Sequence, residues 1–249
     1  MKSMKSKSIV VNIEIATLDL EQALERFMDL YQSRKVKLAK DFATHLREIW
    51  KRKRNQIEQT ARRLHYDAVA VIPGGVKLPE FHQQMTQGYK PTWESPEFQK
   101  CGSWTGIKSF QVKADRIVLF HDCLELDAHP LTKQLLGQNL FQITGLSEAE
   151  LTQRIAQGKP FKGQIQVDGK LQTFDGFAPE DWLAINAERV KRTKQHLDSE
   201  TCSWLIRSCC GRRVPGLLWN GDRLYAHALE PGYRYAHLAP RPAAVFCLI

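Results

Sequence analysis

A chain of 249 residues with 43% hydrophobic and 25% charged side chains has the composition of an ordinary globular protein. This composition excludes a disordered, a collagen-like and a membrane-spanning chain, and the length fits one large domain or two small ones. The net charge is +9, and residues 1–65 hold most of it, with 15 basic and 8 acidic side chains. The first residues are basic, but the apolar run after them ends at Asn12, so we expect no secretion signal and a cytoplasmic location.

The first predicted element is a half-buried strand at residues 9–15, where apolar and polar side chains alternate. Thr17 or Asp19 then caps a helix whose apolar residues keep a three-and-four spacing up to Tyr31. A second helical pattern covers residues 34–65. No Pro or Gly separates the two patterns, so they form either a helical hairpin or one long helix.

The second helical pattern is basic on every side at residues 51–54, which read Lys-Arg-Lys-Arg. Such a turn cannot enter an apolar core on any face, so it must meet solvent or a charged partner. One interpretation is that this region contacts the phosphates of a nucleic acid; the alternative is a solvated helix face. The candidate nucleic-acid-binding residues are Arg47, Lys51, Arg52, Lys53, Arg54, Arg62 and Arg63.

The middle of the chain alternates short strand and helix signals. Ser147 and Glu150 have the spacing of a capping box that opens a helix. Asp168-Gly169 between two alternating runs predicts a hairpin with a type I′ turn, and Pro179 suits the first turn of a helix. The predicted strands lie at residues 66–72, 109–112, 116–120, 165–167 and 171–174, and the predicted helices at 148–157 and 179–197.

Together these elements predict an α+β fold. Pro and Gly recur between residues 73 and 105, which indicates a boundary there. The predicted organisation is an N-terminal strand and basic helical region at 1–72, a loop-rich connection at 73–105, and a mixed domain at 106–249 that ends in short antiparallel strands.

The six cysteines form no C-x-x-C pair and have no regular spacing, so we expect reduced thiols. Cys202, Cys209 and Cys210 could supply thiolates to a zinc ion, but adjacent cysteines rarely reach one tetrahedral metal. We therefore predict neither a metal site nor a cofactor.

Residues 121–129 form a cluster of ligand-type side chains after a predicted strand. If the chain stayed extended, its His, Cys, Glu and Asp residues would share one face and could hold a divalent metal for hydrolysis. The spacing matches no known hydrolase or calcium motif, and Leu124 and Leu126 favour an edge strand with one solvated face. We predict no catalytic residue here.

Two strand patterns near the end of the chain place aromatic and basic side chains on one face each. Side by side, they would form an aromatic and cationic platform that could stack bases or sugars or hold a protein surface. The alternative is that one face packs inward as core. The candidate ligand-binding residues are Arg223, Tyr225 and His227 on the first strand, and Tyr233, Tyr235 and His237 on the second.

The closing motifs are Trp204-Leu205, Pro215-Gly216, Trp219 with Gly221, and Arg241-Pro242-Ala243 before an apolar strand. This pattern resembles the end of C-type-lectin-like domains in bacterial and phage proteins, including the variable proteins of diversity-generating retroelements. The resemblance implies a mixed fold with a buried final strand. It also implies structural roles for Trp204, Trp219 and Arg241, with display residues between Trp219 and His237.

These observations favour a non-enzymatic binding protein of bacterial or phage origin that presents a C-terminal aromatic and cationic face. The alternative is a nucleic-acid-binding subunit of a ribonucleoprotein or mobile-element complex that uses the basic helical region. The expected partner is a protein or a nucleic acid, within a larger assembly and without a membrane.

Overall fold

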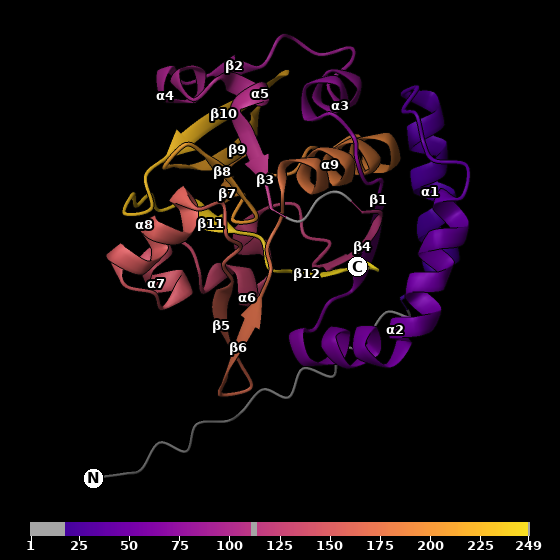
Figure 1. Cartoon of the computed structure of the whole chain (residues 1–249), viewed down its shortest axis with the longest axis horizontal. Helices are drawn as coiled ribbons and strands as arrows, with labels where there is room; N and C mark the ends of the chain where they lie inside the picture. The colour runs from indigo at the N-terminus through magenta and orange to yellow at the C-terminus, as the bar shows by residue number, and fades with distance from the viewer. Residues whose placement is uncertain (1–17, 111–113, 249) are drawn as a thin grey trace.

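The computed structural model describes residues 18–110 and 114–248, where helices and several small sheets combine in an α+β fold (Figure 1). Its helices are α1 (Leu20–Ser33), α2 (Phe42–Leu64), α3 (Leu78–Met85), α4 (Pro96–Lys100), α5 (Ser103–Gly106), the 3-10 turn η1 (Leu126–Ala128), α6 (Pro130–Lys133), α7 (Leu140–Thr144), α8 (Glu148–Ala156) and α9 (Pro179–Thr193). None of these described helices is long and apolar enough to cross a membrane.

The strands form one three-stranded, one five-stranded and two two-stranded sheets within the described residues. They are β1 (Ala68–Ile72), β2 (Trp93–Glu94), β3 (Ile107–Ser109), β4 (Arg116–Phe120), β5 (Gly163–Val167), β6 (Lys170–Phe174), β7 (Cys202–Trp204), β8 (Ser208–Cys210), β9 (Val214–Asn220), β10 (Arg223–Leu229), β11 (Leu238–Pro240) and β12 (Ala243–Phe246).

The first two helices are separate. Asp19 caps α1, since its carboxylate accepts hydrogen bonds from the backbone N–H groups of Glu21 and Gln22 at 2.9 and 3.1 Å. The helix ends at Ser33, and a turn through residues 34–41 precedes α2. The strand predicted at residues 9–15 lies outside the described residues.

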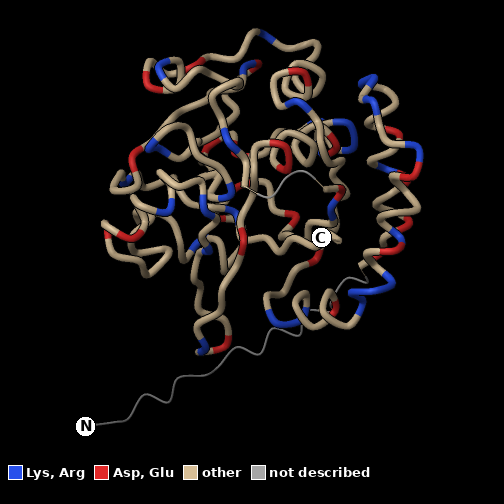
Figure 2. The backbone as a smooth tube through the Cα atoms, viewed as in Figure 1, with Lys and Arg blue, Asp and Glu red and all other residues tan. Residues whose placement is uncertain are grey.

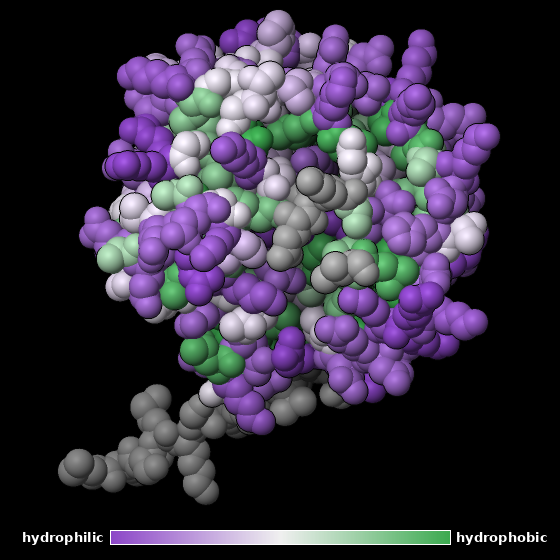
Figure 3. All heavy atoms as spheres, in the orientation of Figure 1, coloured by the Kyte–Doolittle hydropathy of each residue, from purple (hydrophilic) through white to green (hydrophobic). Residues whose placement is uncertain are grey.

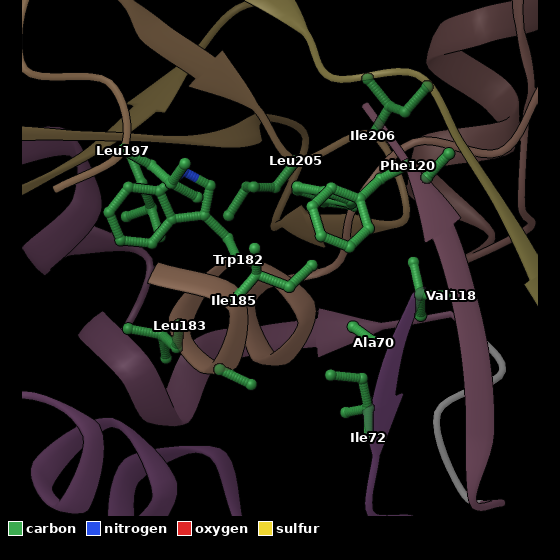
Figure 4. Packing of buried hydrophobic residues seen from close by; sticks show 14 of the residues in the cluster. Ala70, Ile72, Val118, Phe120, Trp182, Leu183, Ile185, Leu197, Leu205 and Ile206 are labelled. Carbon is green, nitrogen blue, oxygen red and sulfur yellow. The ribbon is translucent and has the colours of Figure 1, made fainter. Parts of the chain in front are cut away.

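The three-stranded sheet joins distant parts of the chain in the order β1-β4-β12, with both pairs antiparallel. The predicted N-terminal region and the predicted mixed domain therefore share one sheet and one apolar core. Helix α9 contacts β1, and Figure 4 shows its Trp182 and Ile185 in the apolar interior with Ala70 and Ile72 of β1 and Val118 of β4. This core fixes α9 at the centre of the molecule.

The connection at residues 73–105 is not a simple loop, because it contains α3, β2, α4 and α5. Ser95 caps α4 by accepting the N–H of Phe98 at 3.2 Å, and Pro96 occupies the first helical turn. Phe98 and Trp104 are buried and their rings contact each other. Pro and Gly here mark the ends of short elements rather than an open linker.

Local signals in the middle of the chain are confirmed. Asp168 and Gly169 both have positive φ, at 49° and 74°, as a type I′ turn between β5 and β6 requires. Ser147 and Glu150 form the predicted capping box of α8. Helix α9 begins at Pro179 but ends at Thr193, short of the predicted residue 197. The strand predicted at residues 109–112 overlaps β3 (Ile107–Ser109) at Ser109, and residues 111 and 112 lie outside the described residues.

The five-stranded sheet has the order β11-β7-β9-β10-β2. Strands β9 and β10 form an antiparallel hairpin, whereas the short edge strand β2 pairs parallel to β10. The second strand of the predicted platform, at residues 233–237, does not form. Two turns replace it: the N–H of Tyr233 donates to Glu230 O, and the N–H of Leu238 donates to Tyr235 O.

A buried ion pair closes this part of the core. Asp198 accepts hydrogen bonds from Arg241 Nη2 at 2.6 Å, Trp182 Nε1 at 2.7 Å and Ser203 Oγ at 2.5 Å. Arg241 also donates to the carbonyl groups of Cys123 and Leu124. Trp204 and Trp219 are buried as well, so the three residues with implied structural roles all lie inside.

Candidate functional site

The strand β10 presents the first predicted set of site residues on one face. Arg223, Tyr225 and His227 are half-buried, and the residues that alternate with them are buried. This alternation follows from the pleat of a strand that covers the core with one face. The predicted strand face is therefore present, with its three side chains facing outward.

Trp93 completes this face, and the sequence reasoning missed it. It lies on the edge strand β2, directly opposite Tyr225 in the parallel register. Its ring centroid is 5.3 Å from that of Tyr225 and 5.4 Å from that of His227, and the side chain is 38% exposed. We call Trp93, Arg223, Tyr225 and His227 the Trp93 face.

The charge of the Trp93 face comes from Arg223. Burial lowers the pKa of His227, an effect that nearby Glu97 opposes, so the imidazole is neutral at neutral pH. Beside the face, the Lys90 ammonium and the Asp222 carboxylate lie 2.8 Å apart and cancel each other. The surface is thus aromatic with one cation, rather than strongly basic.

The second set of predicted site residues is not part of this face. Tyr233 and Tyr235 are 47% and 53% exposed and lie in turns, with His237 also exposed. The ring of Tyr235 contacts that of His237 at 5.6 Å, but the neighbours of β10 in the sheet are β9 and β2. The prediction of two strand faces side by side is wrong, because Pro231-Gly232 turns the chain away from the sheet.

The basic residues of α2 lie mostly on the surface, and Figure 2 shows Lys and Arg recurring along this helix. Several are held by carboxylates: Arg47 pairs with Glu21 at 2.7 Å, Arg52 with Glu48, and Arg54 with Glu58 at 2.9 Å. The turn at residues 51–54 meets solvent, as its charge requires. Hydrophilic side chains dominate the lower right of the space-filling view, where α2 lies (Figure 3).

The segment at residues 121–129 is not extended, so its side chains do not share the one face that could have held a divalent metal. It is a loop followed by η1, and its side chains support the fold. His121 is buried, donates from Nε2 to Leu64 O and stacks on His129 at 3.8 Å. The Glu125 carboxylate accepts the backbone N–H groups of residues 199–201.

The buried Cys202, Cys209 and Cys210 are neutral thiols. Burial raises the pKa of Cys202 and of Cys209, and burial together with Cys101 raises that of Cys210. Among the residues that the structure describes, no group of three or more His, Cys, Asp or Glu side chains could hold a metal ion.

The Trp93 face and the basic helix α2 lie at opposite ends of the molecule in Figure 1, with β2 and β10 at the top and α2 at the bottom. One ligand of modest size cannot use both surfaces together.

We compared the chain with known proteins. No protein-family model, no curated protein and no solved structure matches this chain.

Proposed function

We propose that this chain is a non-enzymatic binding protein that docks a protein partner on the Trp93 face. The observation that carries the proposal is the convergence of Trp93, Tyr225 and His227 from two strands, with Arg223 on the same strand face. Trp, Tyr and Arg are enriched among the residues that contribute most at protein interfaces, and Trp and Tyr bury large areas at low entropy cost.

The charge of the face favours a protein over a nucleic acid. Nucleic-acid surfaces combine aromatic rings with several free cations that neutralise phosphates. Here Arg223 is the cation of the face, His227 is neutral, and Lys90 is compensated by Asp222. We also propose that the closing segment of this chain is lectin-like and that the protein is of bacterial or phage origin. Both are compatible with the binding of a protein partner.

Site-specific photo-crosslinking in the native host tests the proposal. A benzophenone amino acid replaces Trp93, and in a second strain it replaces Leu171, which is 57% exposed on β6. We expect a discrete protein adduct from position 93, absent from position 171, and at least several-fold weaker when Arg223→Ala is added. Adducts of equal pattern at both positions, or a nuclease-sensitive adduct at position 93, would overturn the proposal.

A second candidate function is nucleic-acid binding by α2. The observation that favours it is the composition of the helix, with seven Lys or Arg and two Glu, together with the exposure of Lys51, Arg52 and Arg54. Each contacted phosphate releases counterions, so the affinity should fall steeply with salt.

Binding of RNA and DNA at two salt concentrations tests this candidate. The comparison is between the intact chain and a variant with Lys51, Arg52, Lys53 and Arg54 all changed to Ser. Salt-sensitive binding that the variant loses would support the candidate. No binding even at low salt would remove it.

A further inference from the structure

A cleft of about 600 Å³ lies where α2, the region of α7 and α8, the β5–β6 hairpin and β12 come together. This volume is within the range of roughly 300–1,000 Å³ that is typical of small-molecule sites. Its lining is Lys53, Thr144, Leu146, Arg154, Pro160, Phe161, Lys162, Gln164, Thr173, Asp175, Arg207, Val245 and Cys247. We call it the Arg207 cleft.

The cleft carries an excess of positive charge. Lys53, Arg154, Lys162 and Arg207 line it, and the one lining carboxylate, Asp175, compensates Lys162, which leaves three cations in excess in the lining. That carboxylate is already used by the protein: its Oδ1 is 3.0 Å from the Lys162 ammonium, and its Oδ2 accepts the backbone N–H of Val245. The electrostatic field in the cleft therefore attracts an anion.

Arg207 is the most deeply placed of these cations, with its side chain only 7% exposed. Its Nη1 donates to Asp181 Oδ2 at 3.1 Å. Within the part of the chain that the structure describes, its Nε and Nη2 donate to no other residue. The ion pair with Asp181 fixes the guanidinium in place, and its remaining donors form a rigid fork beside the cleft.

Asp181 does not fully compensate Arg207, because Arg116 shares it. Nε and Nη2 of Arg116 donate to Asp181 Oδ1 at 2.9 and 2.6 Å. Glu180 lies beside this pair, and burial raises the pKa of its carboxyl, although the nearby Arg116 lowers it. The carboxylate hydrogen bonds of the two buried guanidinium groups thus converge on Asp181, and a buried cation that shares its hydrogen-bonded partner is costly.

We propose that the Arg207 cleft binds the phosphate group of a small phosphorylated molecule. The guanidinium of Arg207 donates to the phosphate oxygens in the planar arrangement that suits this group, and Lys53, Arg154 and Lys162 surround it at the rim. Phe161, Leu146 and Val245 provide apolar wall for the rest of the ligand. The site goes beyond the proposed function, since it shares no residue with the Trp93 face.

Isothermal titration calorimetry of the full chain with pyrophosphate tests this site. We expect saturable binding that weakens with salt and becomes at least about tenfold weaker in Arg207→Met, because a charge-assisted hydrogen bond is lost. A second variant guards against a folding defect: Lys162→Glu changes an exposed side chain at the rim and should weaken binding several-fold.

The matched control is Lys170→Glu. It makes the same charge change on the same hairpin, but Lys170 is exposed and does not line the cleft. Two outcomes would overturn the site. One is that Lys170→Glu weakens pyrophosphate binding as much as Lys162→Glu does, and the other is that Arg207→Met leaves pyrophosphate binding unchanged.

A short single-stranded RNA distinguishes the source of the phosphate. One result is that RNA and pyrophosphate compete for the cleft, and that Arg207→Met and Lys162→Glu each lose the binding of both. That result would keep the cleft as a phosphate site and assign it to the backbone of a nucleic acid. RNA binding that survives both substitutions, with no measurable pyrophosphate binding, would overturn the proposal.

Discussion

Arg241 and Arg207 are both buried beside an aspartate, but their surroundings differ. Arg241 pairs with Asp198, which also accepts hydrogen bonds from Trp182 and Ser203, and its other donors reach two backbone carbonyl groups. Arg207 uses one nitrogen on Asp181, which Arg116 already occupies. It also lines a cleft, whereas Arg241 lies between β11 and β12, in contact with the loop after β4.

The difference separates a structural role from a binding role. A buried guanidinium whose donors are all used by the protein stabilises the fold and has nothing to offer a ligand. A buried guanidinium that shares its carboxylate and faces a cavity keeps donors and charge for an anion. Residue type and burial are the same in both cases, so only the partners distinguish them.

The largest expected effect is that of Arg241→Met. The change leaves Asp198 buried without its cation, which should lower the free energy of unfolding by about 3–5 kcal/mol. Urea unfolding measures it. Arg212→Met, at an exposed position, is the control and should change stability by less than about 0.5 kcal/mol. If Arg241→Met lowered the free energy of unfolding no more than Arg212→Met does, the structural role of Arg241 would be contradicted.

Arg207→Met should destabilise the protein less than Arg241→Met does. Asp181 keeps Arg116 and the N–H of Ala178, so the loss is that of one charged hydrogen bond, about 1.5–3 kcal/mol. The same urea experiment ranks the two variants. If Arg207→Met were as damaging as Arg241→Met, the two arginines would have the same structural role and the comparison would fail.

The buried His121, which like Arg241 has a structural role, can be tested by pH. Burial, and then the nearby His129, lowers the pKa of His121 to about 3. An unfolded histidine binds a proton below about pH 6.5, and the folded one does not until about pH 3, so stability is present above pH 6.5 and is lost as the pH falls through this window.

This histidine should contribute about 1.4 kcal/mol of lost stability per pH unit below pH 6.5. His121→Gln removes the titrating group and should reduce the slope by that amount, measured by urea unfolding from pH 7.5 down to acid. Unfolding at pH 7.5 measures the packing cost of the substitution separately. An unchanged slope would show that His121 takes up its proton equally in both states.

The smallest expected effect is at an exposed pair. Glu48→Gln breaks the contact with Arg52 on α2, whose side chains are 45% and 64% exposed. Solvent screens such a pair, so the loss should be at most about 0.5 kcal/mol, measured in the same urea series. A larger loss would mean that α2 depends on its ion pairs, and that its basic residues are structural rather than free for a partner.

The sequence predicts the elements whose signals are local. The cap at Asp19, the turn at Asp168-Gly169 and the first-turn Pro179 each specify a backbone conformation within a few residues. The strand at residues 233–237 was predicted from alternation alone. That pattern gives no information on whether a neighbouring strand is available to pair with it.

The candidate sites depend on contacts between distant residues. Trp93 and Tyr225 meet because β2 pairs parallel to β10, and no short-range pattern specifies that pairing. Arg207 follows an apolar run, yet only the folded chain shows that it shares Asp181 with Arg116 and borders a cleft. The basic turn of α2 was predicted because its charge alone excludes burial.

The pairing of β12 with β4 also affects how the chain is made. During synthesis, β1 and β4 leave the ribosome long before β12, since Phe120 pairs with Ala243. Until then one edge of β4 is unpaired, and all five of its residues are buried in the finished sheet. A nascent chain in this interval exposes an apolar strand that can pair with a neighbour, so it needs either rapid completion or protection by a chaperone.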